Sequence, residues 1–304
     1  MKTILITGAT GFIGKSLINR LLEMDYRIVS LVRRKSEIRT EFIQADFFNR
    51  EDLKSIVHDL NPSIVLHLAS EKIRSNIDFF QAVDSDFEIS KNLIEACLKS
   101  PRLEKFIFLG SCEEYGTGFP PFSEENKEYP VSNYSYSKLK TVNLLNYLYR
   151  NYNFPAIILR PSVVYGPGQG TDMFLPDLIN KLILKEKFEM SLGEQTRDYL
   201  YINDLIKAII QVITSENIIG KILNLASSTS YKIREITQLV ADILEIDFCQ
   251  FIRLGALPYR KNEIMDYRVN SKLAECLLGW KSETDIRQGL LQTVEYYKKL
   301  YTHG

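Results

Sequence analysis

A tyrosine and a lysine at helical spacing are the two residues of this chain best suited to acid–base chemistry. Tyr134 and Lys138 lie four residues apart, so a helix would place both side chains on one face. A phenol ordinarily has a pKa of about 10, and a neighbouring ammonium favours the phenolate. We therefore expect Lys138 to lower the pKa of Tyr134 and make it an acid or base for a carbonyl or alcohol. A solvated helix face is the alternative interpretation of this common spacing.

A glycine-rich turn near the N-terminus is the second informative feature, because it follows an apolar strand and opens a helix. Gly8, Gly11 and Gly14 have a G-x-x-G-x-x-G spacing, which permits a tight turn and lets backbone N–H groups approach a pyrophosphate. The helix N-terminus adds partial positive charge for the phosphates. A turn without a ligand is the alternative. We expect a dinucleotide to contact Gly8, Thr10, Gly11, Phe12, Ile13 and Gly14.

The end of the second predicted strand selects between the two nicotinamide cofactors. A carboxylate there would bind the ribose 2′-hydroxyl of NAD, whereas an arginine suits the 2′-phosphate of NADP. This chain has Arg33 and Arg34 there and no carboxylate, which favours NADP and leaves NAD as the second choice. Two solubility charges on a surface loop are the alternative. Asp46 and Phe47, after the next short strand, are predicted at the adenine edge.

Composition narrows the class of protein. The 304 residues include 38 Lys and Arg and 38 Asp and Glu, so no net charge attracts nucleic acid or an anionic membrane. Hydrophobic residues make up 45% of the chain, which is ordinary for a soluble globular protein. The four cysteines form no C-x-x-C pair, and with three histidines they offer no metal-site spacing. We expect no metal, no signal peptide, no membrane span and a cytoplasmic location.

Apolar runs alternate with amphipathic stretches through the first half of the chain. Strands are predicted at 2–7, 27–32, within 38–45, and at 64–69, 105–109, 156–159 and 221–226, and helices at 13–24, 50–60, 80–99, 134–152 and 201–214. This alternation indicates βαβ units, hence an α/β protein with a Rossmann doubly wound parallel sheet. We assign 1–167, with 198–227 returning to it, to the dinucleotide-binding domain. Residues 168–197 and 228–304 are assigned to a smaller C-terminal substrate-binding lobe.

These features resemble the extended short-chain dehydrogenase/reductases, in particular the branch that acts on nucleotide sugars. The resemblance covers nearly the whole chain. It rests most firmly on the opening loop at 7–14 and on Tyr134 with Lys138. Further matching segments are 66–69, 110–116, 160–168, Arg197-Asp198-Tyr199 with Asp204, and Leu278-Gly279-Trp280. They point to the nucleotide-sugar members without naming a substrate.

The resemblance implies a role for each matching residue. Tyr134 would pass a proton to or from a sugar oxygen, Lys138 would also bind the nicotinamide ribose, and Ser111 would hydrogen-bond the reacting oxygen. The cofactor would also be lined by Leu68, Ala69, Ser70 and Pro161. Substrate contacts are predicted for Lys72, Cys112, Glu113, Val163, Arg197 and Arg268, with Arg197 as the main ligand of the diphosphate. The alternatives are a local Arg197–Asp198 ion pair and a merely buried Cys112.

Three reactions share such a scaffold: 4-epimerisation, 4,6-dehydration and 4-ketoreduction of a nucleotide sugar. The dehydratases carry Thr-Asp-Glu where this chain has Ser111-Cys112-Glu113, and a neutral thiol is a weak proton donor. The epimerases recycle a tightly held NAD, whereas Arg33 and Arg34 favour exchangeable NADPH. We therefore expect an oxidoreductase that reduces the 4-keto group of a nucleotide-linked 6-deoxy sugar with NADPH, Tyr134 being the proton donor.

Other functions stay open at this point. An NAD-dependent nucleotide-sugar 4-epimerase is the second enzyme hypothesis, and a reductase of non-nucleotide aldehydes or ketones is the third. A regulatory NADP-binding protein is the non-enzyme alternative, since fold does not fix function. Two departures from the family pattern bear on the site, because Asp86 and Val163 each stand where asparagine is common. Relatives pair through the two long helices, so a homodimer is expected.

Overall fold

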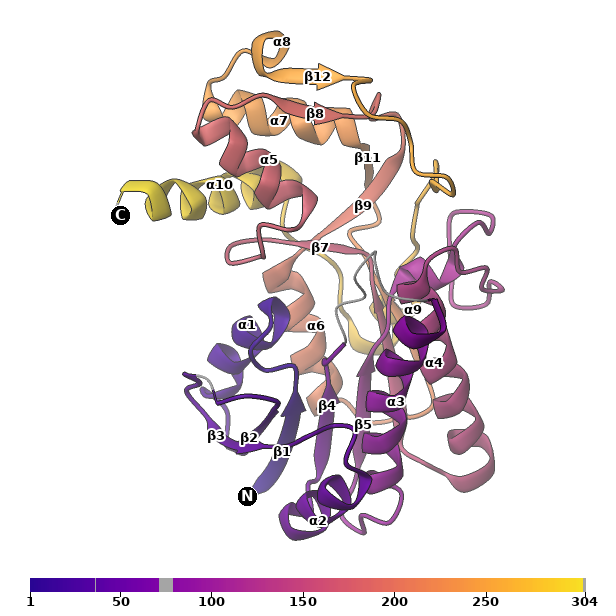
Figure 1. The fold of residues 1–304 in the computed structure, drawn as a ribbon. Coiled ribbons are helices and arrows are strands. Elements are labelled where there is room, and N and C mark those ends of the chain that lie inside the picture. Colours follow the sequence, from indigo (N-terminus) through magenta and orange to yellow (C-terminus); the bar gives the residue numbers. More distant parts are fainter. Residues whose placement is uncertain (36, 71–78, 303–304) are drawn as a thin grey trace.

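The computed structural model describes residues 1–35, 37–70 and 79–302, which form two parts stacked one above the other (Figure 1). A seven-stranded parallel sheet lies at the centre of the lower part, in the order β3-β2-β1-β4-β5-β6-β10. Its strands are β1 (Lys2–Thr7), β2 (Tyr26–Val32), β3 (Glu41–Gln44), β4 (Ile64–His67), β5 (Lys105–Leu109), β6 (Ala156–Pro161) and β10 (Ile222–Leu225).

The large sheet is buried on both faces because its strands are nearly continuous apolar runs. Residues 4–6 of β1 and 106–108 of β5 have no exposed surface. Such runs are typical of a parallel sheet covered by helices on both sides. β1 pairs with β2 on one side and with β4 on the other, so the strand order reverses between β1 and β4. Ligands of open α/β sheets bind outside the carboxyl ends of the strands at such a reversal.

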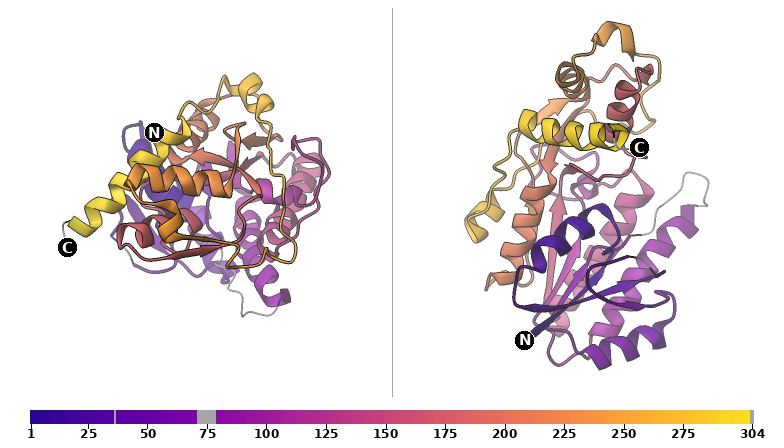
Figure 2. Two further views of the ribbon diagram at one scale, coloured as in Figure 1. Left: turned by 90° about the horizontal axis from the view of Figure 1, so that it is seen from above. Right: turned by 90° about the vertical axis from the view of Figure 1, so that its left-hand side faces the viewer.

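Helices cover the two faces of this sheet. α2 (Arg50–Leu60), α3 (Phe79–Cys97) and α4 (Asn133–Tyr152) pack side by side on one face, and α1 (Phe12–Leu21) and α6 (Ile202–Thr214) pack together on the other (Figures 1 and 2). Each of α1, α3 and α4 follows a strand of the sheet in the sequence. Their N-termini therefore lie toward the carboxyl ends of the strands, which brings Tyr134 and Lys138 of α4 to the edge where ligands bind.

The upper part contains two small sheets and the remaining helices. One sheet is formed by β7 (Val163–Tyr165), β9 (Thr196–Tyr201) and β11 (Ser230–Lys232), and the other by β8 (Phe188–Met190) and β12 (Ile252–Leu254). Around them lie α5 (Phe174–Ile183), α7 (Ile233–Leu244), α8 (Phe248–Phe251) and α10 (Ile286–Thr302), as Figure 1 shows. After β9 the chain returns to the large sheet, where Ile222 of β10 pairs with Ile158 of β6.

The segment after α9 (Lys272–Leu278) fastens the C-terminal residues to α6. The indole Nε1 of Trp280 donates a hydrogen bond to the carbonyl oxygen of Asp204 at 3.0 Å. The carboxylate of Asp204 accepts hydrogen bonds from the hydroxyl of Ser282 and the backbone N–H of Thr284, each at 2.9 Å. Trp280 and Asp204 are both almost fully buried. This anchor joins the end of the chain to a helix of the large sheet.

The predicted fold class is confirmed, and the differences lie at element ends. The helix expected at 13–24 ends at Leu21, because the chain must turn before Tyr26, which pairs with Lys2. The strand expected within 38–45 is Glu41–Gln44. The sequence pattern does not predict the small sheets of the upper part, because all of their strands except β9 have only three residues and carry no readable alternation. Among the described residues, no helix has the length and apolar character needed to cross a membrane.

Candidate active site

The glycine turn between β1 and α1 leaves no room for side chains. Gly8 has a φ of +75°, and a Cβ added there would lie 2.7 Å from the backbone of Leu68 and Ala69. A Cβ at Gly14 would lie 2.2 Å from the carbonyl oxygen of Gly8. No side chain caps the N-terminus of α1 at Gly11, so N–H groups of its first turn remain available to an anion. These features fit a pyrophosphate held by backbone N–H groups.

The strand end beside this turn is placed by one threonine. The hydroxyl of Thr7 accepts a hydrogen bond from the backbone N–H of Ala69 at 3.2 Å. Leu68, Ala69 and Ser70 thus follow β4 alongside the glycine turn and are partly exposed, as a cofactor contact requires. Lys72 lies outside the described residues.

The end of β2 carries three consecutive cations. Arg33, Arg34 and Lys35 are all exposed. Asp46 is also exposed, and its carboxylate accepts a hydrogen bond from the backbone N–H of Phe48 at 3.0 Å. The side chain of Phe47 is buried in the core between the sheet and the helices α2, α3 and α4. Only the backbone of Phe47 can therefore contact a cofactor.

Ser111 lies at the carboxyl end of β5 and caps the 3₁₀-helix η1 (Cys112–Tyr115). Its hydroxyl accepts from the backbone N–H of Glu113 at 3.1 Å, and its own N–H donates to Glu114 Oε1 at 2.8 Å. This reciprocal capping box holds the Ser111 backbone in place. The hydroxyl is consequently oriented at the strand end, where it is near enough to Tyr134 to favour the phenolate of that residue.

Tyr134 and Lys138 stand on the first two turns of α4, which Ser132 and Ser135 cap reciprocally. The Nζ atom of Lys138 lies 5.7 Å from the centre of the Tyr134 ring and 5.0 Å from the centre of the Phe108 ring. Lys138 is buried with only 2% of its surface exposed, and Tyr134 is partly exposed. The structure thus brings the predicted pair together with Ser111 at the carboxyl ends of the strands.

The electrostatics of Tyr134 differ from the sequence expectation. Burial raises the pKa of Tyr134, and the carboxylates of Glu113, Asp86 and Glu114 raise it further, while the nearby Ser111 side chain lowers it in part. The net shift is upward, so the prediction that the pKa of Tyr134 is brought down is wrong. Desolvation and three carboxylates outweigh one ammonium, and Tyr134 is held as a neutral phenol.

Lys138 experiences opposing effects. Burial lowers the pKa of its ammonium group, and the carboxylates of Asp86 and Glu114 raise it, with a net downward shift. Glu114 is fully buried and already paired with Arg160, whose Nε donates to Glu114 Oε2 at 2.8 Å. The charge of Glu114 is therefore largely balanced, which leaves Asp86 as the principal counter-charge of Lys138.

Three of the predicted substrate residues, Glu113, Val163 and Arg268, lie in different surroundings. Glu113 is exposed, although burial of its carboxyl group raises its pKa against the opposing effect of Arg197 and Arg260. Val163 is half-buried in β7, where it pairs with Tyr199. Pro161, which was predicted to line the cofactor, is buried at the end of β6. The guanidinium of Arg268 is exposed and paired with Asp266 at 2.7 Å.

The Cys112 thiol is not placed for substrate contact. Its Sγ donates to the carbonyl oxygen of Arg160 at 3.0 Å within a buried cluster that includes Tyr115, Phe122 and Tyr267. Burial raises the pKa of this thiol well above its ordinary value. The prediction of a substrate-contacting side chain is corrected accordingly, because the side chain fills space behind the strand end instead.

Arg197 is occupied within the protein. Its guanidinium forms an ion pair with Glu263, and it also donates to the carbonyl oxygens of Thr196 and Ile264 at 2.7 Å. Asp198 instead accepts a hydrogen bond from Ser162 at 2.8 Å, so the alternative of an Arg197–Asp198 pair is not what the structure shows. A substrate phosphate would have to displace Glu263 to bind Arg197.

Sequence reasoning overlooked Glu114 and Glu263 and did not assign a role to Asp86. The Ser-x-x-Glu pattern of a capping box could have revealed Glu114 beside Ser111. No local signal marks Glu263, which is 66 residues from Arg197 in the sequence. Asp86 reaches the site only through tertiary contacts, which a sequence pattern does not show.

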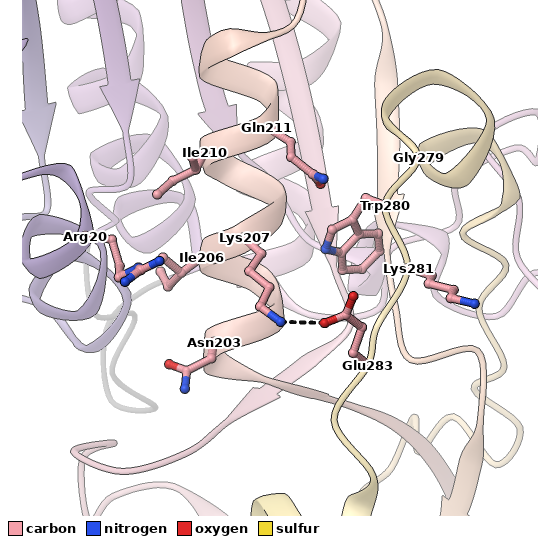
Figure 3. Close-up of a pocket in the computed structure, with 10 residues that line it drawn as sticks. All are labelled: Arg20, Asn203, Ile206, Lys207, Ile210, Gln211, Gly279, Trp280, Lys281 and Glu283. Carbon is pink, nitrogen blue, oxygen red and sulfur yellow. Dashed lines mark hydrogen bonds and ion pairs between the residues drawn. The ribbon is translucent and has the colours of Figure 1, made fainter. Parts of the chain in front are cut away.

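A separate surface pocket of about 400 Å³ lies between α1, α6 and the segment around Trp280 (Figure 3). Figure 3 shows Lys207 paired with Glu283 across it, at 2.6 Å. None of its lining residues belongs to the predicted catalytic or binding set. We therefore assign the chemistry to the edge with Ser111, Tyr134 and Lys138 rather than to this pocket.

Comparison with known proteins agrees with this geometry. The chain is 24% identical to the dTDP-D-glucose 4,6-dehydratase of Bos taurus (98% of this chain, 89% of that protein) and 26% identical to an uncharacterized UDP-glucose epimerase of Bacillus subtilis (98% of each). The crystal structure of UDP-glucuronic acid 4-epimerase from Bacillus cereus, in complex with UDP-glucuronic acid and NAD, superposes with a TM-score of 0.89. That enzyme is 28% identical over 98% of this chain and 100% of its own. A sequence model described as the NAD dependent epimerase/dehydratase family matches residues 4–226, and the chain belongs to that family.

Proposed function

We propose that this protein uses NADPH to reduce the 4-keto group of a nucleotide-linked 6-deoxy sugar. The observation that carries the proposal is the run of exposed cations Arg33, Arg34 and Lys35 at the end of β2, where a carboxylate would select NAD. Guanidinium groups suit the additional 2′-phosphate of NADPH because they form paired, charge-assisted hydrogen bonds with it. An enzyme that consumes an exchangeable NADPH carries out a net reduction.

The cofactor would be held by the chain's own backbone and strand ends. Gly8 and Gly14 let the turn pack closely against the Leu68–Ala69 backbone and against itself, and a pyrophosphate would lie at the uncapped N-terminus of α1. Leu68 to Ser70 would support the nicotinamide half, and Arg33 with Arg34 the adenosine half. When bound, NADPH would supply the hydride of the reduction.

Tyr134 is set up to donate a proton. Burial and the neighbouring carboxylates keep it a neutral phenol, and the nearby Ser111 opposes that shift only in part. A neutral phenol can protonate a carbonyl oxygen as negative charge develops there, and the Ser111 hydroxyl would stabilise the same oxygen. Lys138, beside the Tyr134 ring, would favour the phenolate that remains after the transfer.

The surroundings of Ser111 argue against 4,6-dehydration, although relatives with that name resemble the chain. Dehydration needs an acid for the departing hydroxyl in addition to a base. Position 112 supplies only a buried, neutral thiol that is engaged with the Arg160 carbonyl. Glu114 is paired with Arg160, so Glu113 is the one carboxylate of this segment that is exposed. A single carboxylate cannot fill both roles.

A nucleotide sugar is the substrate that the relatives' names support. The named enzymes act on dTDP- or UDP-linked sugars, and Arg197 offers this chain a guanidinium for the diphosphate. Binding would exchange the carboxylate of Glu263 for phosphate oxygens. The predicted division into 1–167 with 198–227 and 168–197 with 228–304, and the homodimer through α3 and α4, belong to the same proposal.

The second candidate is a nucleotide-sugar 4-epimerase that retains NAD. The likeness to the Bacillus cereus 4-epimerase over the full length of both chains favours it. Such an enzyme would use Tyr134 first as a base and then as an acid, whereas the neutral phenol found here needs to act only as an acid in a reduction.

Product analysis tests the proposal directly. The purified protein is given NADPH and a dTDP- or UDP-linked 4-keto-6-deoxy sugar, and cofactor oxidation is followed by absorbance while sugars are identified by mass spectrometry. We expect one NADPH consumed per 4-hydroxyl formed. Conversion of the 4-hydroxy sugar to its C4 stereoisomer without net cofactor change would establish the epimerase instead. Loss of water from a 6-hydroxy sugar would overturn both assignments. Tyr134→Phe serves as the inactive control.

A further inference from the structure

A buried carboxylate lies behind the catalytic pair. Asp86 is on α3 and only 1% exposed. Its Oδ1 atom accepts from the hydroxyl of Ser70 at 2.7 Å, and its Oδ2 atom accepts from the hydroxyl of Ser137 at 2.7 Å. Ser70 follows β4, and Ser137 precedes Lys138 on α4. Two hydroxyl groups from separate elements thus hold this carboxylate between the nucleotide-binding strand end and the catalytic helix.

A second chain of hydrogen bonds fixes the backbone of Asp86. The hydroxyl of Ser90 donates to the Asp86 carbonyl at 3.2 Å, so it accepts from Nε2 of His67 at 2.9 Å. The remaining nitrogen, Nδ1, then accepts from the hydroxyl of Thr7 at 2.7 Å. Burial lowers the pKa of His67 to about 3, so the ring is neutral and consistent with this direction of donation. The position of Asp86 is therefore tied to the end of β1.

Among the residues that the structure describes, two carboxylates act on the charge of Lys138 from the elements packed around it. Asp86 approaches from α3 and Glu114 from η1, and both favour the ammonium form. His67, from β4, is neutral. Glu114 is neutralised by Arg160, at 2.6 Å. Tyr134, from the same helix, is a neutral phenol that Glu113 also influences.

We propose that Asp86 is a positioning residue for the catalytic pair, a fixed counter-charge that keeps Lys138 as an ammonium and Tyr134 as a phenol. A buried lysine loses its charge readily unless a carboxylate compensates for desolvation. Asp86 provides that compensation without a direct role at the substrate, because Ser70 and Ser137 hold it in place. This inference rests on the roles proposed above for Tyr134 and Lys138.

The sign of the effect follows from charge. Replacement of Asp86 by the isosteric asparagine removes a negative charge, which destabilises the ammonium of Lys138 and stabilises the phenolate of Tyr134. Both groups would lose their protons at lower pH. We expect the pKa of Lys138 to fall by about one unit or more. The alkaline loss of activity should move to lower pH by a similar amount.

The titration is measured on the free protein, without substrate or turnover. Protein labelled with [ε-¹³C]lysine is titrated by NMR, and the Lys138 resonance is assigned by its absence in Lys138→Met. Wild type is compared with Asp86→Asn and with Asp84→Asn. Asp84 is on the same helix but 66% exposed and paired with Lys140 at 2.7 Å, so its loss removes the same charge from the surface. The pH profile of kcat is recorded for the same three proteins.

We expect the downward shift in Asp86→Asn and no shift in Asp84→Asn. An unchanged Lys138 titration in Asp86→Asn would overturn the inference, and so would an equal shift in both variants. If the asparagine disturbs folding, Asp86→Ser, which is smaller and retains a hydroxyl, is measured against the same outcomes. Failure of the wild type to reduce a 4-keto sugar would instead refute the proposed function, because the NMR titration does not depend on that reaction.

Discussion

Glu114 acts on two buried cations, Arg160 and Lys138, which are held in different ways. Arg160 has no exposed surface and contacts two carboxylates directly, Glu114 at 2.6 Å and Glu128 at 2.8 Å. Burial acts against its charge, but Glu114, Tyr115 and Glu128 outweigh burial and raise the pKa of Arg160. For Lys138 burial prevails, and the pKa is lowered.

The difference indicates that the charge of Arg160 serves the structure, whereas that of Lys138 is suited to a part in the proposed chemistry. A guanidinium with two direct carboxylate partners stays charged at every accessible pH and holds η1 against β6. The ammonium of Lys138, whose counter-charge is held by serine hydroxyls, has a lowered pKa because burial prevails. We propose that only the second arrangement can respond to a cofactor or to a proton moving on Tyr134.

The largest effect should come from breaking the buried ion pair between Glu114 and Arg160. Glu114→Gln leaves Arg160 with a buried charge that Glu128 balances only in part, and it also weakens the cap of Ser111. We expect a loss of about 3 kcal/mol in the free energy of unfolding, measured by urea denaturation. Glu113→Gln, one residue away and exposed, is the control and should change stability little. If Glu114→Gln and Glu113→Gln were equally stable, Arg160 would not be the structural charge that distinguishes it from Lys138.

The chemical side of the comparison depends on Tyr134. Tyr134→Phe should reduce turnover by about two orders of magnitude or more, because it removes the proton donor, while stability and cofactor affinity change little. Tyr136→Phe, on the same helix but 43% exposed, is the matched control. The measurements are steady-state kinetics and cofactor binding by fluorescence. Retained turnover in Tyr134→Phe would exclude this residue from the mechanism.

A third test asks whether the neutral histidine contributes to stability. The folded protein holds the pKa of His67 at about 3, below the ordinary 6.5, so the unfolded chain binds a proton that the native state refuses. The stabilisation that the neutral His67 gives the folded state is complete above pH 6.5. As the pH falls toward 3, this contribution to the free energy of unfolding declines by about 1.4 kcal/mol per pH unit. His67→Gln should make the unfolding free energy less steep in that range. His58→Gln, at an exposed position, is the control for the loss of a histidine.

The smallest effect should come from the exposed guanidinium groups of Arg33 and Arg34, which contrast with the buried one of Arg160. The double variant Arg33→Ser/Arg34→Ser should raise KM for NADPH about tenfold with kcat preserved, since charged hydrogen bonds to the 2′-phosphate are lost. KM for NADH should change little. Arg253→Ser, an exposed arginine in the upper part of the molecule, is the control. Parallel changes in both cofactors would refute the selection of NADPH by these residues.

Local patterns were sufficient for the sheet and for the glycine turn. The turn at Gly8 to Gly14 has a fixed spacing between a strand and a helix, and its steric demands are visible in the residue types themselves. The spacing of Tyr134 and Lys138 likewise places them on one helix face without knowledge of the rest of the fold.

The electrostatics of the site depend on distant contacts, which explains why the pKa of Tyr134 was expected to move in the wrong direction. Ser137 and Asp86 are 51 residues apart, and Arg160 and Glu114 are 46 residues apart. The carboxylates that outweigh Lys138 come from α3 and η1, whose packing against α4 no local pattern reveals. No local pattern reveals Glu263 either, although its carboxylate pairs with the Arg197 guanidinium that was predicted to bind a phosphate.

Trp280 gives the protein a built-in optical probe. It is the single tryptophan of the chain, and its buried indole is bonded to the carbonyl oxygen of Asp204 in α6. Intrinsic emission excited selectively at tryptophan therefore reports on one place, the attachment of the chain's end to α6. A red shift that precedes the loss of helical circular dichroism would reveal detachment of that segment before the sheet itself unravels.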